Sequence, residues 1–162
     1  MMKSILLKIA AVLAGFVLLV FVAGVSGLTF CVWPTFLGDK VLDISPVVLS
    51  QLNSLKAERK FEFDKSSFYF GAPNELARAS AQAAVDSVIV SLMQELPRSP
   101  QRAVVLGVFK EALAEFKTSE SEERDQFLVY LERIMSIVGV KDSGELFNVW
   151  RYGFPYGWVF SA

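Results

Sequence analysis

The stretch SESEERDQFLVYLERIMSIVG, residues 119–139, decides the fold class of this chain. It opens with Ser119 and Glu122 at the spacing of a capping box, in which the two side chains satisfy backbone N–H groups at a helix start. Its apolar residues then recur every three or four positions, which places them on one face of a helix: Phe127, Leu131, Ile134, Met135 and Val138. Gly139 is a typical helix-terminating residue. The stretch therefore predicts an amphipathic helix that contributes one face to a helical core.

Similar residues at helix starts and ends predict four more helices in the chain. Ser45-Pro46 precedes a helix over 46–56, Pro73 precedes one over 74–96, and Ser99-Pro100 precedes one that ends near residue 117. A last short helix begins after Asp142 or Ser143 and ends at Gly153. Five helices with short links predict an all-α fold, a compact bundle.

The helix over 74–96 carries many small residues. Its segment ARASAQAA, residues 77–84, suggests close packing against a neighbouring helix. Its expected apolar side comprises Leu76, Ala83, Val88, Leu92 and Leu96.

Aromatic residues alternate with other residues between the helices expected over 46–56 and 74–96. Phe61, Phe63, Phe68 and Phe70 follow the period of two that is typical of a strand, with Asp64-Lys65-Ser66-Ser67 between the two pairs. This segment is either a small β element, such as a short hairpin, or a loop with buried rings.

The N-terminal segment is apolar enough to enter a membrane. Residues 9–33 form a run of 25 mostly apolar residues, and no charge occurs between Lys8 and Asp39. A helix of this length spans about 37 Å, which exceeds the roughly 30 Å hydrocarbon layer. The run is longer than the apolar region usual in signal peptides, so we expect an uncleaved anchor. A cleaved signal sequence with a site at Val25-Ser26-Gly27, and a lipoprotein modified at Cys31, are the alternatives.

The charges on either side of this segment predict its orientation. Lys3 and Lys8 precede the run, whereas Asp39 and Lys40 cancel each other after it. By the positive-inside rule the N-terminus stays in the cytoplasm. We therefore expect residues 1–38 to be a single-pass anchor in a bacterial inner membrane. Residues 39–162 then form a periplasmic helical domain that ends in an aromatic tail.

Composition excludes several classes of function. The net charge is −1, without the basic surface that nucleic-acid binding requires. Histidine is absent and Cys31 is the single cysteine, which removes Ser-His-Asp and Cys-His nucleophiles and imidazole metal ligands. No glycine-rich phosphate loop follows a strand. We therefore expect a protein that is not an enzyme and has no catalytic residues, cofactor or metal site.

Two features are candidates for binding a partner protein. The first is a dense acidic group in SESEERD, which either stabilises the helix dipole or steers a basic partner surface: Glu120, Glu122, Glu123 and Asp125. The second is the C-terminal tail, where aromatic residues recur every second position from Tyr152 to Phe160. The tail either docks onto the bundle, contacts the membrane interface or exposes Tyr156 and Trp158 as anchors for a partner.

The stretch from about residue 120 to residue 154 carries a distinctive set of residues: Glu123-Arg124, Tyr130, Glu132, Ile134, Met135, Ile137, Val138, Gly139, Ser143-Gly144, Leu146, Asn148, Trp150, Tyr152, Gly153 and Phe154. By these residues the stretch resembles the C-terminal part of a family of small helical bacterial proteins known only as a domain of unknown function. The resemblance covers about a fifth of the chain, and the N-terminal span is a departure from the family. The family is similar in style to toxin-immunity proteins, and it implies no catalytic residues.

These observations favour a binding function over a catalytic one. We expect an inner-membrane immunity protein whose periplasmic domain binds and occludes a toxin delivered by a secretion system, type VI or similar. The alternative is an accessory or structural subunit of a cell-envelope complex. In either case the partners are a protein and the membrane, and not a nucleic acid.

Overall fold

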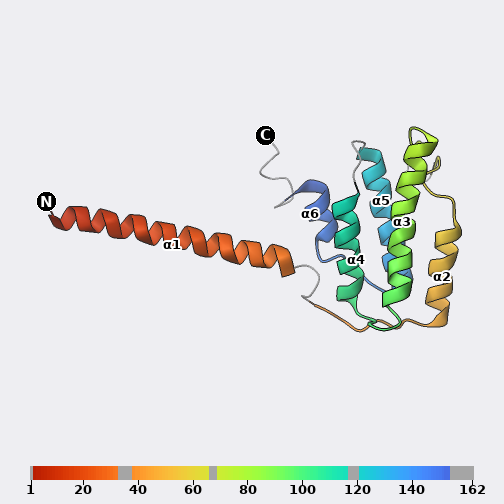
Figure 1. Ribbon diagram of the computed structural model, residues 1–162, viewed down its shortest axis with the longest axis horizontal. Coiled ribbons are helices and arrows are strands. Elements are labelled where there is room, and N and C mark those ends of the chain that lie inside the picture. Colours follow the sequence, from red (N-terminus) through yellow and green to blue (C-terminus); the bar gives the residue numbers. More distant parts are fainter. Residues whose placement is uncertain (1, 33–37, 66–68, 117–120, 154–162) are drawn as a thin grey trace.

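The fold is entirely helical in the part of the chain that the structure describes. The computed structural model describes residues 2–32, 38–65, 69–116 and 121–153. Six helices follow one another, and all but the first form a bundle (Figure 1): α1 (Met2–Val32), α2 (Pro46–Ala57), α3 (Glu75–Glu95), α4 (Arg102–Glu115), α5 (Ser121–Val138) and α6 (Leu146–Tyr152). The prediction of an N-terminal apolar helix followed by a bundle of about five helices is confirmed.

Two of the predicted helix starts are formed by side-chain caps. The hydroxyl of Ser45 accepts a hydrogen bond from the Val48 N–H at 3.5 Å, and the Asn74 side chain accepts one from Ala77 at 2.9 Å. Each cap satisfies one of the N–H groups that a helix leaves without a partner in its first turn. These caps explain why α2 and α3 begin where the sequence predicts.

The start of α4 differs from the prediction because the linker that follows α1 docks there. Gln101 pairs with Val41 in an isolated β-bridge, so the helix begins at Arg102 and not beside Pro100. Gln101 makes no side-chain cap, and Asp39 supplies one instead by accepting a hydrogen bond from the Ala103 N–H at 2.8 Å. The segment that leaves α1 is thereby fixed to one end of the bundle.

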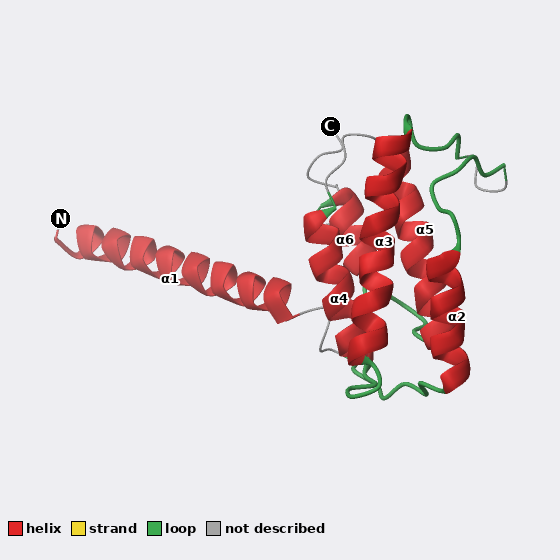
Figure 2. Cartoon of the chain, turned by 45° about the vertical axis from the view of Figure 1, so that its right-hand side comes forward, coloured by secondary structure: helices red, strands yellow, loops and turns green. Residues whose placement is uncertain are grey.

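The core lies around α3, which packs against α2, α4 and α5. Figure 2 shows α3 between α2 and α4 with α5 behind it. The predicted face of α5 is buried in full. On α3, Leu76 and Ala83 are exposed, contrary to prediction, and Val85 and Ile89 are buried in their place. The three helices that pack against α3 determine which of its residues are buried. The alanine-rich sequence of α3 alone does not reveal this face.

The segment between α2 and α3 is a loop within its described residues, with no strand. Asp64 and Tyr69 exchange two backbone hydrogen bonds, of 2.9 and 3.1 Å, in an isolated bridge. Phe61 is buried as predicted, but Phe63 and Phe70 are 64% and 83% exposed, and the buried ring is that of Tyr69. Phe68 lies outside the described residues. The prediction of buried rings is therefore right for Phe61 and wrong for Phe63 and Phe70.

The first helix stands apart from the bundle, and α1 projects away from it in Figures 1 and 2. Every described side chain of α1, residues 8–27, is exposed. Within α1, Lys8–Gly27 is long and apolar enough to cross a membrane, as a single span or a signal sequence does. Glu75–Glu95, α3, meets the same length and composition test, but its Val85, Ile89 and Leu92 lie in the bundle core.

The last helix is anchored by an indole and not by the predicted caps. Its N-cap is Glu145, which has a φ of 72° and makes no side-chain cap. Asp142 instead accepts hydrogen bonds from the Gly144 N–H and the Arg102 guanidinium. The Trp150 indole donates to the Leu113 carbonyl oxygen at 2.8 Å. This bond holds α6 against α4. Of the predicted aromatic tail, Tyr152 is 57% exposed, and the aromatic residues from 154 onward lie outside the described residues.

Candidate functional site

A groove of about 540 Å³ runs between α3 and α4 and reaches the first turn of α5. The side of α3 that faces it carries mainly small residues, which leave the space between the helices unfilled. These residues are Ala77, Ser80, Ala81, Ala84, Ser87, Val88 and Ser91. The opposite wall and the end of the groove are formed by Val108, Glu111, Ala112, Glu115, Phe116 and Glu123, with Pro73 beside α3. The small residues of α3 therefore line a groove rather than only a close helix contact.

The groove has a negative electrostatic character. Every charged side chain among its described lining residues is a carboxylate: Glu111, Glu115 and Glu123. Glu111 and Glu115 are exposed and lie one helical turn apart on α4, so they project from the same face. Carboxylates that line a concave surface attract cations more strongly than isolated surface charges do.

Glu123 is the buried member of this group. Only 5% of the residue is exposed, although it lies in the first turn of α5. The Tyr69 hydroxyl donates a hydrogen bond to its Oε1 at 3.2 Å, whereas its Oε2 has no hydrogen-bond partner within the described structure. A buried carboxylate oxygen without a donor is costly to maintain. The Glu123 carboxylate at the end of the groove thus has one buried oxygen that no described group satisfies.

Tyr69 is held in place by the loop between α2 and α3. Its backbone pairs with Asp64, and its ring meets Phe61 edge-on with the ring centres 6.3 Å apart. The Phe61 N–H in turn donates to the Tyr130 hydroxyl oxygen at 3.2 Å, which ties the loop to α5. Burial, with a smaller contribution from the Glu123 charge, raises the pKa of Tyr69 above its ordinary value of about 10. Tyr69 therefore stays protonated and donates to Glu123.

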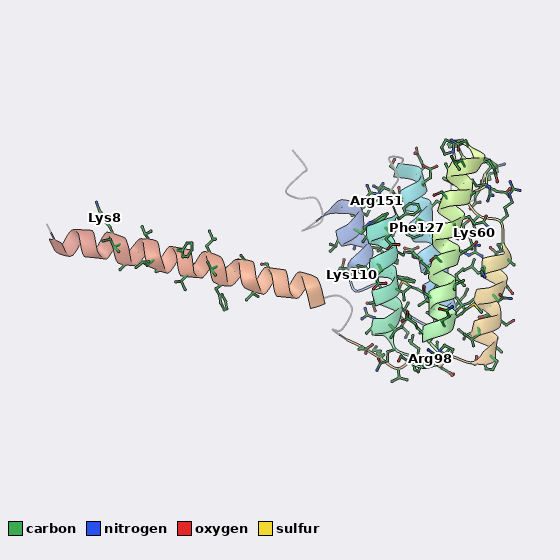
Figure 3. All side chains as sticks on the ribbon, in the orientation of Figure 1. Lys8, Lys60, Arg98, Lys110, Phe127 and Arg151 are labelled. Carbon is green, nitrogen blue, oxygen red and sulfur yellow. The ribbon has the colours of Figure 1, made fainter. Side chains whose placement is uncertain are left out.

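An aromatic cluster supports the same end of the groove from inside the bundle. The rings of Phe116 and Phe127 stack in parallel with their centres 4.1 Å apart, and each lies 6.5 Å from the Trp150 ring. The Arg124 guanidinium covers the Trp150 ring at 4.6 Å. Figure 3 shows Phe127 within the bundle and Arg151 on α6. The cluster joins α4, α5 and α6, so the groove wall at Phe116 has a rigid support.

The structure separates the predicted acidic residues instead of gathering them into one exposed surface. Glu122 is exposed, Glu123 is buried in the groove, and Asp125 binds Arg151 of α6 through two hydrogen bonds. The hydrogen bonds to Asp125 raise the pKa of Arg151. Glu120, Tyr156 and Trp158 lie outside the described residues. Of the predicted site residues that the structure describes, Glu123 is therefore the one that lines the groove.

The sequence interpretation missed Glu111 and Glu115. Two glutamates four residues apart are common on exposed helix faces, and only the fold places this pair opposite the serines of α3. Among the described residues, no three His, Cys, Asp or Glu side chains form a group that could hold a metal ion. The three groove carboxylates therefore do not form such a group.

A second buried charge lies elsewhere in the bundle and is fully paired. The Lys60 side chain is completely buried, and its ammonium group donates to Asp86 Oδ1 at 2.7 Å and to the Lys56 and Glu58 carbonyl oxygens at 3.0 Å each. Figure 3 shows Lys60 beside α3. Since all three donors of this ammonium group have acceptors, the pair closes the turn after α2 and offers nothing to a ligand.

Comparisons with known proteins identify the family of the helical domain and a solved structure similar to it. A family model described as domain of unknown function DUF4844 matches residues 43–155. No curated protein matches the chain. A crystal structure of a DUF3571 family protein from Acinetobacter baumannii is similar, with 25% sequence identity and a TM-score of 0.61, and the match covers 66% of this chain and 89% of that protein. The expected likeness to a small helical domain of unknown function is confirmed.

Proposed function

Since the chain belongs to the DUF4844 family of domains of unknown function, we propose its function from the groove between α3 and α4. The protein is a membrane-anchored immunity protein whose helical domain binds and occludes a secreted antibacterial toxin. The main support for this proposal is the groove, a concave surface whose described charged lining residues are all carboxylates. One of them, Glu123, has a buried oxygen without a described hydrogen-bond partner. A cationic partner surface would cover the groove and compensate these charges.

The membrane anchor supports a role at the cell envelope. In this proposal α1 crosses the inner membrane with Lys3 and Lys8 on the cytoplasmic side, and the bundle faces the periplasm. The linker is fixed to the end of the bundle that contains the start of α4, through Asp39 and Ala103. Glu115 and Glu123, in the last turn of α4 and the first turn of α5, lie toward the other end. That part of the groove is then turned away from the linker and toward incoming proteins.

Occlusion is a mechanism that needs no catalytic group. Interfaces of inhibitors gain specificity from charge complementarity, and a positive partner surface is drawn to the carboxylates of the groove. The exposed rings of Phe63 and Phe70, whose centres lie 6.4 Å apart, belong to the same loop as Tyr69. They offer exposed apolar contact area, as aromatic residues do in interfaces.

The experiment is a protection assay in the native organism combined with purification of the tagged full chain. Deleting the gene should make cells sensitive to wild-type neighbours of the same strain, and expressing the full chain should restore protection. A toxin should copurify with the chain. Repeated recovery of envelope-complex subunits alone, with no change in sensitivity, would contradict the proposal.

The alternative is an accessory subunit of a cell-envelope complex, favoured by the length and exposed apolar surface of α1. Replacing residues 9–33 with an unrelated membrane span separates the two functions. An immunity protein should keep its protection after the replacement because its partner contacts the bundle. A subunit that binds through its span should lose its partners.

A further inference from the structure

Glu123 lines the groove, and its buried oxygen Oε2 accepts no hydrogen bond from a described residue. We propose that the groove receives the ε-ammonium group of a lysine of the partner protein, and that the Glu123 side chain turns Oε2 toward the groove to accept one of its hydrogen bonds. The inference rests on the proposed function for the source of the lysine. The preference for an ammonium group follows from the charges and hydrogen bonds of the residues that line the groove.

The charge of the groove selects a cation. Glu123 is 5% exposed and has one unpartnered oxygen, and the described lining residues include two further carboxylates and no basic side chain. A buried charge is stable when it is paired and hydrogen-bonded. A cationic donor in the groove supplies both, whereas an anionic or apolar group leaves Oε2 unsatisfied.

The hydrogen bond from Tyr69 selects ammonium over guanidinium. A guanidinium binds a carboxylate best with two parallel hydrogen bonds, one to each oxygen. In Glu123 the Tyr69 hydroxyl already donates to Oε1 at 3.2 Å, so the second bond of a bidentate guanidinium would have to share Oε1 with Tyr69, whereas Oε2 has no described donor. An ammonium group is a compact charge with three donors that suits one carboxylate oxygen and neighbouring hydroxyls.

The remaining lining residues match the rest of a lysine side chain. Ala77, Ala81 and Ala84 offer apolar surface to its aliphatic carbons, while Ser80 and Ser87 offer hydroxyl acceptors. Lysine commonly buries its aliphatic stem along such a surface and keeps the charge at a polar end. A volume of about 540 Å³ also exceeds what a single side chain needs, so the flanking backbone of the partner has room to enter.

The test is calorimetric titration of the full chain in lipid nanodiscs at low salt. The probes are a blocked glycine-lysine-glycine peptide, its arginine and N-acetyl-lysine counterparts, and spermidine as a free polyamine. The lysine peptide should bind at least about tenfold more tightly than the arginine or acetyl-lysine peptide. Glu123→Gln should weaken its binding about tenfold or more, whereas the matched Glu122→Gln variant, changed at an exposed neighbour, should bind like the wild type.

Glu123→Gln keeps an oxygen that accepts from Tyr69, so it should fold, and its circular dichroism and melting temperature establish this. If it does not fold, Glu115→Gln, changed at an exposed position of the wall, should still weaken lysine binding several-fold. Equal binding of arginine, or unchanged binding by the folded Glu123 variant, would overturn the inference. Spermidine binding tenfold more tightly than lysine would assign the groove to free polyamines instead. Lysine binding without any toxin in the protection assay would refute the proposed function and leave the ammonium site standing.

Discussion

Tyr69, in the loop between α2 and α3, donates its hydroxyl hydrogen bond to Glu123, in the first turn of α5, across 54 positions of the chain at 3.2 Å. The contact satisfies Oε1 and leaves the buried Oε2 of Glu123 without a described donor. It also joins the loop to the end of the bundle where α4, α5 and α6 meet. Stability and ligand binding should therefore both respond to changes at this pair.

Replacing Tyr69 with phenylalanine should destabilise the protein by about 1–3 kcal/mol, because both oxygens of the buried Glu123 carboxylate then lack a donor. The double variant Tyr69→Phe with Glu123→Leu should recover part of this loss, since no buried charge remains. Denaturant unfolding of the full chain in detergent micelles measures both. A single variant as stable as the wild type would contradict the buried hydrogen bond.

The same pair predicts how stability depends on alkaline pH. The pKa of Tyr69 is raised in the folded protein, so the unfolded chain loses this proton first. The stabilising contribution is complete below the unfolded pKa of about 10 and is lost as the pH rises above it. The free energy of unfolding should fall above pH 10 in the wild type and fall less steeply in Tyr69→Phe. Parallel pH profiles for the two proteins would argue against this interpretation.

Removing Asp86 should be among the most damaging single changes in the bundle. Asp86→Ala leaves the fully buried ammonium group of Lys60 without its counter-charge, and such losses cost about 3–5 kcal/mol. The matched control is Glu58→Ala, which breaks the half-exposed pair with Arg133 and should cost less than about 1 kcal/mol. Equal effects of the two changes on the unfolding midpoint would show that Lys60 is not buried as described.

The cap that Asp39 provides for α4 should contribute to the attachment of the linker. Asp39→Ala removes the acceptor for the Ala103 N–H and should cost about 1 kcal/mol. It should also increase proteolysis between α1 and α2. Asp43→Ala, changed at an exposed residue of the same segment, should leave both the stability and the protease pattern unchanged. Equal stability and equal protease patterns of the two variants would show that Asp39 does not cap α4.

Much of the bundle follows from local sequence rules. The apolar face of α5 and the cap at Ser45 depend on residues within one or two helical turns of each other, so spacing alone reveals them. The cap at Asn74 is equally local, but the predicted start of α3 rested on Pro73. The burial of Glu123 also has a local signal. It lies four residues before Phe127 and seven before Tyr130, hence on the buried face, whereas Glu122 does not. Interpreting the glutamates as one charged group concealed this difference.

Other features depend on contacts between distant segments. The alternation in the loop did not reveal that Tyr69, and not Phe70, faces inward, because this choice follows from the contacts of Tyr69 with Phe61 and Glu123. The groove itself exists because the small residues of α3 lie opposite Glu111 and Glu115 of α4. Neither helix alone predicts it, since each sequence is compatible with an ordinary exposed surface.

The central claim is that a toxin occupies the groove between α3 and α4, and site-specific photo-cross-linking in the native organism tests it most directly. A photoreactive amino acid at Ser87, in the groove, should form an adduct with one secreted protein that kills cells lacking this chain. The same amino acid at Ser54, on the exposed surface of α2, should form no such adduct. Adducts of Ser87 with envelope subunits alone, or the same adducts from both positions, would contradict the account.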